Sequence, residues 1–155
     1  MYHEILVPTD GSAVAGVAVD HAVDIAEKYD ATVHALYVVD PDWLTYSLGT
    51  EQLDRIRQGD FGDLTDLEAD AEDATGAVAD AARERGLHAI EEVRAGTPHR
   101  IITRYADSED IDLVVMGSHG RSGVKRALLG SVTERVLRSS HLPILVVDEQ
   151  GVREE

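Results

Sequence analysis

The chain has 155 residues, of which 43% are hydrophobic. Because this length and composition are enough for one buried core, we expect a single domain over residues 1–155. Its 30 acidic and 14 basic residues give a formal net charge of −16, which disfavours binding to the phosphate backbone of nucleic acids. The lack of cysteine excludes disulfides, thiolate zinc sites and a cysteine nucleophile, and no apolar run approaches the ~18 residues of a membrane span.

The first third of the chain predicts a strand, a helix and a second strand. Residues 3–8 form a short apolar run closed by turn formers, which is typical of a buried strand. Ser12 can cap a helix whose apolar residues recur at helical spacing up to Lys28. Residues 31–39 are rich in β-branched and aromatic side chains and predict the second strand. The pattern weakens over residues 40–66, for which we expect a variable, partly helical connection.

The rest of the chain continues this alternation. The predicted helices cover residues 67–85, 98–108 and 131–140, and the predicted strands cover 87–94, 112–116 and 143–147, followed by a charged tail at 149–155. Thr97 is the expected cap of the middle helix and Pro98 its first residue. Strands that alternate with helices indicate right-handed crossovers and a parallel sheet. We therefore predict an α/β fold, a single open doubly wound five-stranded parallel sheet with helices on both faces.

The loop after the fourth predicted strand is the most informative segment for function. Ligands of open parallel sheets bind outside the carboxyl ends of the strands, where this loop lies. Gly117 and Gly120 permit backbone geometry closed to other residues and let N–H groups approach an anion. Gly130 and Ser131 place a second group of N–H groups at a helix N-terminus. Two such clusters predict a site for a polyphosphate.

The local charge of this segment supports an anionic ligand. Residues 116–141 hold five basic residues and one acidic residue, a formal charge of +4 within a chain of −16. Repulsion from distant carboxylates is screened beyond the Debye length of about 10 Å at 0.1 M salt. Close contacts are therefore expected to outweigh the global field. The basic residues are Arg121, Lys125, Arg126, Arg135 and Arg138.

Three segments of the chain form a distinctive set: the spacing Gly-x2-Gly-x9-Gly-Ser over residues 117–131, the first loop Pro8-Thr9-Asp10-Gly11-Ser12, and the closing Leu142-Pro143-Ile144-Leu145-Val146-Val147. Together they resemble the universal stress protein family, and within it the ATP-binding subgroup. The resemblance covers essentially the whole chain. It implies strand order 3-2-1-4-5, a homodimer formed through residues 142–147, and ATP, with Mg or Mn, held in a cleft at the carboxyl edge of the sheet.

The resemblance also implies which residues meet the nucleotide. Asp10 would lie by the nucleoside, backbone groups of Val38 would meet adenine, and Ser131 is the candidate to reach an ATP-bound Mg. No residue is proposed to be catalytic. The predicted binding residues are Pro8, Thr9, Asp10, Val38, Met116, Gly117, Ser118, His119, Gly120, Arg121, Gly130, Ser131, Val132 and Thr133.

Several of these residues also have another interpretation. Ser131 with Glu134 forms a capping-box pattern. Asp10 could brace the first turn, and the three glycines could be ordinary turn residues. His119 could act as an acid or base, but the sequence identifies no carboxylate to orient it.

The resemblance favours a homodimeric, ATP-binding stress-response regulator. Two alternatives stay open: a slow ATPase or phosphotransferase, and a nucleotide-free dimerisation scaffold of the same fold. The enzyme is less favoured because the chain lacks the Gly-x4-Gly-Lys-Ser/Thr loop of common ATPases. Partner proteins cannot be inferred from these residues.

The N-terminus and the lysine content bear on cellular setting. Residues 1–4 lead straight into an apolar run without the cationic start of a secretory signal, so we expect a cytoplasmic protein. Only two of the basic residues, Lys28 and Lys125, are lysines. Such an acidic, lysine-poor composition resembles that of proteins from halophilic organisms, with an ordinary acidic cytosolic protein as the alternative.

Overall fold

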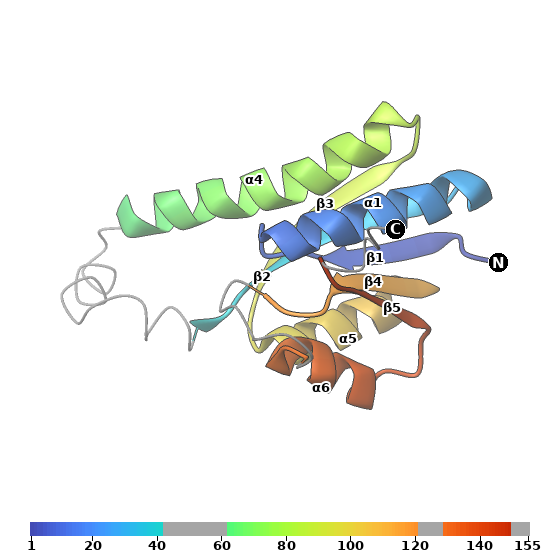
Figure 1. The fold of residues 1–155 in the computed structure, drawn as a ribbon. Helices are drawn as coiled ribbons and strands as arrows, with labels where there is room; N and C mark the ends of the chain where they lie inside the picture. The colour runs from blue at the N-terminus through green and yellow to red at the C-terminus, as the bar shows by residue number, and fades with distance from the viewer. Residues whose placement is uncertain (42–61, 121–128, 150–155) are drawn as a thin grey trace.

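The structure, a computed structural model, describes residues 1–41, 62–120 and 129–149. For residues 62–66 it describes the backbone but not the side chains. Five parallel strands form one sheet in the order β3-β2-β1-β4-β5, which confirms the predicted fold (Figure 1). The strands are β1 (Glu4–Pro8), β2 (Thr32–Val39), β3 (Ala89–Ala95), β4 (Leu113–Gly117) and β5 (Ile144–Val147).

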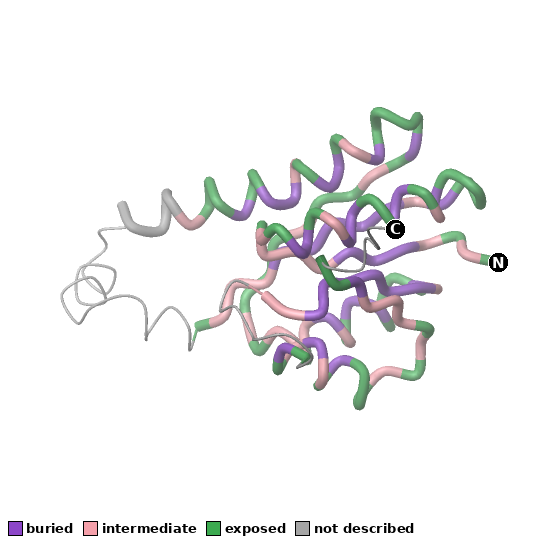
Figure 2. Tube along the Cα trace, in the orientation of Figure 1, coloured by how far each residue is buried: buried purple, intermediate pink, exposed green. Residues whose placement is uncertain are grey.

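Helices cover both faces of this sheet. The helices are α1 (Ala13–Tyr29), α4 (Gly62–Glu84), α5 (Pro98–Ser108) and α6 (Ser131–Ser139). One layer contains α1 and α4, and the other contains α5 and α6 (Figure 1). Buried residues follow the strands and the inward sides of the helices (Figure 2). Among the described helices, none is long and apolar enough to cross a membrane.

Two predicted boundaries differ from the structure for identifiable reasons. Helix α4 begins at Gly62 rather than at residue 67, because Asp and Gly, which are weak helix formers, hide its first turn in the sequence pattern. The remainder of the predicted connection, residues 42–61, and the end of the charged tail lie outside the described residues. The cap of α1 is as predicted: the Ser12 hydroxyl oxygen accepts a hydrogen bond from the N–H of Ala15 at 3.3 Å.

A buried polar triad joins three elements beneath the sheet. His34 of β2 is 2% exposed, with its Nε2 2.6 Å from Glu4 Oε2 and its Nδ1 2.7 Å from the Tyr105 hydroxyl. Burial, together with nearby carboxylates, raises the pKa of Tyr105 to about 12, so the phenol stays protonated. The two ring nitrogens of His34 each have a hydrogen-bond partner, so both polar atoms of the side chain are satisfied. This histidine therefore has a structural role.

The Asp112 carboxylate ties the start of β4 to the start of β1. Its Oδ2 accepts hydrogen bonds from the N–H groups of His3 at 2.7 Å and Glu4 at 2.9 Å. Partial desolvation alone would raise the pKa of Asp112, but these two backbone hydrogen bonds outweigh it and hold the pKa below its usual 3.8. The charged form is thus the one that the fold prefers.

We expect Asp112→Asn to lower the free energy of unfolding at pH 7 by about 0.5–1 kcal/mol, a value reduced by the solvent around the carboxylate. Because the folded pKa is lowered, the contribution of the carboxylate is present above the unfolded pKa and is lost as pH falls through the folded pKa. Urea unfolding of both proteins from pH 7 to about pH 2.5 measures this. A difference that stays constant down to the lowest pH would contradict the assignment.

Candidate functional site

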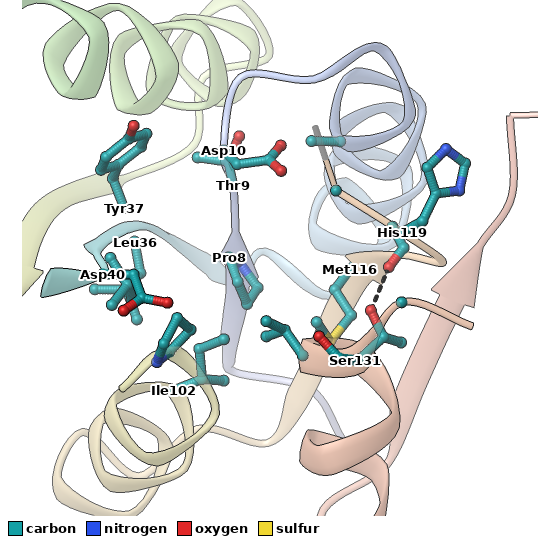
Figure 3. Close-up of a pocket in the computed structure, with 18 of the residues that line it drawn as sticks. Pro8, Thr9, Asp10, Leu36, Tyr37, Asp40, Ile102, Met116, His119 and Ser131 are labelled. Carbon is teal, nitrogen blue, oxygen red and sulfur yellow. Dashed lines mark hydrogen bonds between the residues drawn. The ribbon is translucent and has the colours of Figure 1, made fainter. Parts of the chain in front are cut away.

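A cleft of about 240 Å³ opens at the carboxyl edge of the sheet, between the ends of β1, β2 and β4 and the N-termini of α5 and α6 (Figure 3). Its position follows from the strand order, because the chain direction of the crossovers reverses between β1 and β4. Most of the predicted binding residues line it: Pro8, Thr9, Asp10, Val38, Met116, Gly117, His119, Gly120, Gly130, Ser131, Val132 and Thr133.

Of the predicted binding residues that the structure describes, Ser118 is not part of this lining. Ser118 is buried beneath the loop, where its N–H donates to the carbonyl of Val147 at 2.8 Å and its Oγ lies 3.1 Å from Nδ1 of His119. Arg121 lies outside the described residues, as do Lys125 and Arg126. Ser118 thus joins the glycine loop to β5 and does not reach the cleft.

The glycines of the loop are needed for close packing and not for unusual backbone angles. None of Gly117, Gly120 and Gly130 has a positive φ, so the conformational freedom that glycine permits is not used at these positions. Instead, a Cβ at Gly120 would lie 2.6 Å from Asp10 Oδ2, and a Cβ at Gly130 would lie 3.0 Å from the Cα of His119. The missing side chains let this loop pack against the first loop and against the start of α6.

Helix α6 presents an uncapped N-terminus to the cleft. Its N-cap residue is Gly130, which has no side chain to accept the first N–H groups, so the capping box predicted from Ser131 and Glu134 is wrong. The N–H of Gly130 donates to the carbonyl of Ser118 at 2.7 Å, and the Thr133 hydroxyl donates to the carbonyl of Gly117 at 2.9 Å. These bonds fix the helix so that its first N–H groups and its dipole can stabilise an anion.

The backbone of Val38 faces the other end of the cleft. In a strand, successive backbone groups point alternately to the two neighbouring strands. Leu36 accepts from the N–H of Thr9 at 2.9 Å and so faces β1, whereas Val39 accepts from the N–H of Gly96 at 2.9 Å and so faces β3. The backbone groups of Val38 face the same side as those of Leu36. Val38 lies two residues beyond the hydrogen bond between Thr9 and Leu36, where the loop after β1 turns away from β2. Its N–H and C=O therefore point toward the cleft.

Several lining residues were missed by the sequence analysis. They include Tyr37 and Asp40 from the end of β2, Leu67 from α4, and Pro98 and Ile102 from α5. Figure 3 shows the Asp40 carboxylate directed toward the cleft beside Ile102. The start of α5 could have been found, because it follows a strand and so begins at the same edge of the sheet as the other helices that follow strands.

Two titratable side chains beside the glycine loop are engaged or turned away. Asp10 accepts a hydrogen bond from the N–H of Ser12 at 2.9 Å, so the interpretation of Asp10 as a brace for the first turn is confirmed. Figure 3 shows the imidazole of His119 directed away from Ser131. Among the described residues, no group of three or more His, Asp or Glu side chains could hold a metal ion. The cleft is thus built mainly from backbone groups and apolar walls.

Comparisons with known proteins agree with this geometry. The Universal stress protein family model matches residues 1–148. Universal stress protein MJ0531 of Methanocaldococcus jannaschii is 37% identical over 148 residues, which cover 95% of this chain and 82% of the relative. The structure of MJ0577 from the same archaeon has a TM-score of 0.81 and 29% identity, with coverage of 100% and 99%. A universal stress protein solved in complex with cAMP has a TM-score of 0.66 and 26% identity, with coverage of 95% and 97%.

Proposed function

Because this chain belongs to the universal stress protein family, we propose that it is a regulatory protein that binds ATP in the cleft at the carboxyl edge of the sheet. The observation that carries the proposal is the pairing of two backbone features in one cleft. The N–H and C=O of Val38 face one end, and the uncapped N-terminus of α6 faces the other. The bound cAMP of a structural relative supports an adenine nucleotide as the ligand.

The Val38 backbone suits adenine in particular. Adenine offers one acceptor and one amino donor on adjacent atoms of its Watson–Crick edge, which match one N–H and one C=O. Guanine places a carbonyl and a ring N–H at those positions, so both hydrogen bonds would be lost. Leu36, Ile102, Met116 and Val132 supply apolar surface for the ring.

The phosphates would lie against the glycine loop and α6. The first N–H groups of α6 and the closely packed backbone around Gly120 provide donors, and the helix dipole adds a favourable field. Mg or Mn would be held chiefly by the phosphates and water, with the exposed Ser131 hydroxyl as the protein group that fits such a cation. The metal would neutralise phosphate charge.

Binding is favoured over hydrolysis by the orientation of the side chains. An ATPase needs a base or a positioned water at the terminal phosphate. Of the two titratable candidates near the glycine loop, Asp10 is bonded to the N–H of Ser12 and the His119 ring points away from Ser131. A slow ATPase and an empty scaffold are outcomes that the experiment below separates from a nucleotide-binding regulator.

The remaining features of the proposal concern assembly and setting. Strand β5 is an edge of the sheet, and its residues Ile144 to Val146 are only partly buried, so a homodimer through residues 142–147 would cover this edge. We place the protein in the cytoplasm, and the acidic, lysine-poor composition supports a halophilic source.

We expect ATP at about 100 times its dissociation constant to stabilise the fold by about 2.7 kcal/mol, which for a chain of this size is a rise in Tm of about 5–11 °C. GTP is expected to bind at least tenfold more weakly because of the mismatch at Val38. Thermal unfolding with each nucleotide measures this, and mass spectrometry of nucleotide released from the purified protein complements it. If no adenine nucleotide raised the Tm, the nucleotide-free dimerisation scaffold would be the remaining function. Release of phosphate from the added ATP would indicate the ATPase.

A further inference from the structure

Three of the four arginines of α5 and α6 differ from the other described cations of the helix layers in their pairing, whereas the fourth, Arg138, lies 2.7 Å from Glu134. Arg100, Arg104 and Arg135, which we call the arginine patch, are exposed on α5 and α6 and have no ion-pair partner among the described residues. By contrast, every basic residue of the α1–α4 layer in the described chain has a carboxylate within ion-pair distance: Lys28 with Asp24, Arg83 with Glu91 and Arg85 with Glu27. Carboxylates outnumber cations in this chain, so unpaired arginines need an explanation.

Charge is also segregated between the layers. Helices α1 and α4 together hold eleven acidic and two basic residues, whereas α5 and α6 hold two acidic and four basic residues. The layers lie on opposite faces of the sheet (Figure 1), so the patch is separated from the acidic helices by the sheet itself. At 0.1 M salt the Debye length is about 10 Å, and the patch therefore keeps a positive local field.

The members of the patch lie close enough to act together. Arg100 and Arg104 are four residues apart on α5, so they share one side of the helix with about 6 Å between them along its axis. Burial, and then the positive charges of Arg135 and Arg100, lower the pKa of His99. Helices α5 and α6 share one apolar cluster, which places Arg135 on the helix packed beside Arg100 and Arg104.

We propose that the arginine patch is the docking surface for a short acidic segment of a partner protein. Carboxylates on alternate residues of an extended segment are about 6.6 Å apart, which matches the spacing of Arg100 and Arg104. Guanidinium groups bind carboxylates through two parallel hydrogen bonds, so an unpaired arginine is suited to this partner. A nucleic acid duplex would extend well past three cations into the field of a chain with a formal charge of −16.

The test uses fluorescein-labelled decaglutamate and fluorescence anisotropy in 0.05 M NaCl. The triple variant Arg100→Gln, Arg104→Gln, Arg135→Gln is expected to weaken binding at least tenfold. The matched control, Lys28→Gln, Arg83→Gln, Arg85→Gln, changes the net charge by the same amount on the opposite layer and is expected to bind within twofold of the wild type. Circular dichroism and gel filtration of all three proteins show whether the fold is kept.

Three results would overturn the proposal. The first is a wild-type protein that does not bind decaglutamate, and the second is an equal loss in both triple variants, which would indicate the global field and not the patch. The third is tighter binding of labelled deoxythymidine decamer that the patch variant alone abolishes, which would assign this surface to nucleic acid. Retained binding of ATP by the variant Arg100→Gln, Arg104→Gln separates this result from a failure of the nucleotide site.

Discussion

Replacement of Ser131 by Asp is expected to abolish ATP binding without weakening the fold. The new carboxylate would stand at the first residue of α6, where the proposed phosphates approach, and like charges about 4 Å apart repel by about 1–4 kcal/mol. The same carboxylate interacts favourably with the helix dipole, by about 0.3–1 kcal/mol. Ser131 is exposed, whereas a side chain at buried Gly130 would press on the backbone of His119, so position 131 changes the charge with least disturbance.

The measurement compares Tm with and without saturating ATP in the wild type, Ser131→Asp and the neutral control Ser131→Asn. We expect the rise of about 5–11 °C to be retained in the Asn variant and absent from the Asp variant. Isothermal titration calorimetry is expected to show at least a hundredfold loss of affinity in the Asp variant. If ATP raised the Tm of the Asp variant as much as that of the wild type, the start of α6 would not be part of the binding site.

Replacement of Gly96 by Ala is expected to have the largest effect on stability, a loss of about 3 kcal/mol in the free energy of unfolding. Gly96 joins β3 to α5 with φ at +149°, and a Cβ there would lie 2.8 Å from Cδ1 and 2.9 Å from Cγ1 of Ile101. The backbone conformation costs an L residue about 1–3 kcal/mol, and the overlap with Ile101 a similar amount. Both costs act on the turn that directs α5 toward the cleft.

Two other glycines of this chain serve as controls for the separate causes. Gly86 has φ at +74° with no atom near its missing Cβ, so Gly86→Ala isolates the backbone term of about 1–2 kcal/mol. Gly76 lies within α4 and has only Glu91 Oε1 at 3.8 Å, so Gly76→Ala is expected to stabilise by about 0.5–1 kcal/mol. Urea unfolding should rank the variants 76, 86, 96 in decreasing stability. Equal losses of unfolding free energy at positions 86 and 96 would show that the Ile101 side chain moves aside without a measurable cost.

The parts of this protein that could be predicted from its sequence are those set by local patterns. The alternation of strand and helix signals predicts the α/β class. The strand order is predicted by the resemblance of the loop that contains Gly117 to a known family. Pro98 and Ser12 mark helix starts because their backbone and side-chain chemistry acts within a few residues. Such short-range effects are visible in the sequence alone.

The parts that could not be predicted depend on contacts between distant segments. The need for glycine at position 120 arises from Asp10 in another loop, and no local pattern shows that contact. Ser131 and Glu134 have the capping-box spacing, yet the helix begins one residue earlier than that motif requires, with Gly130 as its N-cap and the N–H of Gly130 bonded to the carbonyl of Ser118. Asp40 and Leu67 reach the cleft only through the arrangement of β2 and α4 around it.

Helix α6 belongs to both proposed surfaces, and this sharing has a thermodynamic consequence. It begins at the cleft with Ser131, carries Arg135 about one turn later, and is anchored by the buried side chains of Thr133 and Val136. If nucleotide binding displaced this nine-residue helix, Arg135 would move with its start, and the two sites would be coupled. Linkage then requires reciprocity: whatever factor nucleotide applies to the affinity for an acidic segment, that segment must apply to the affinity for nucleotide.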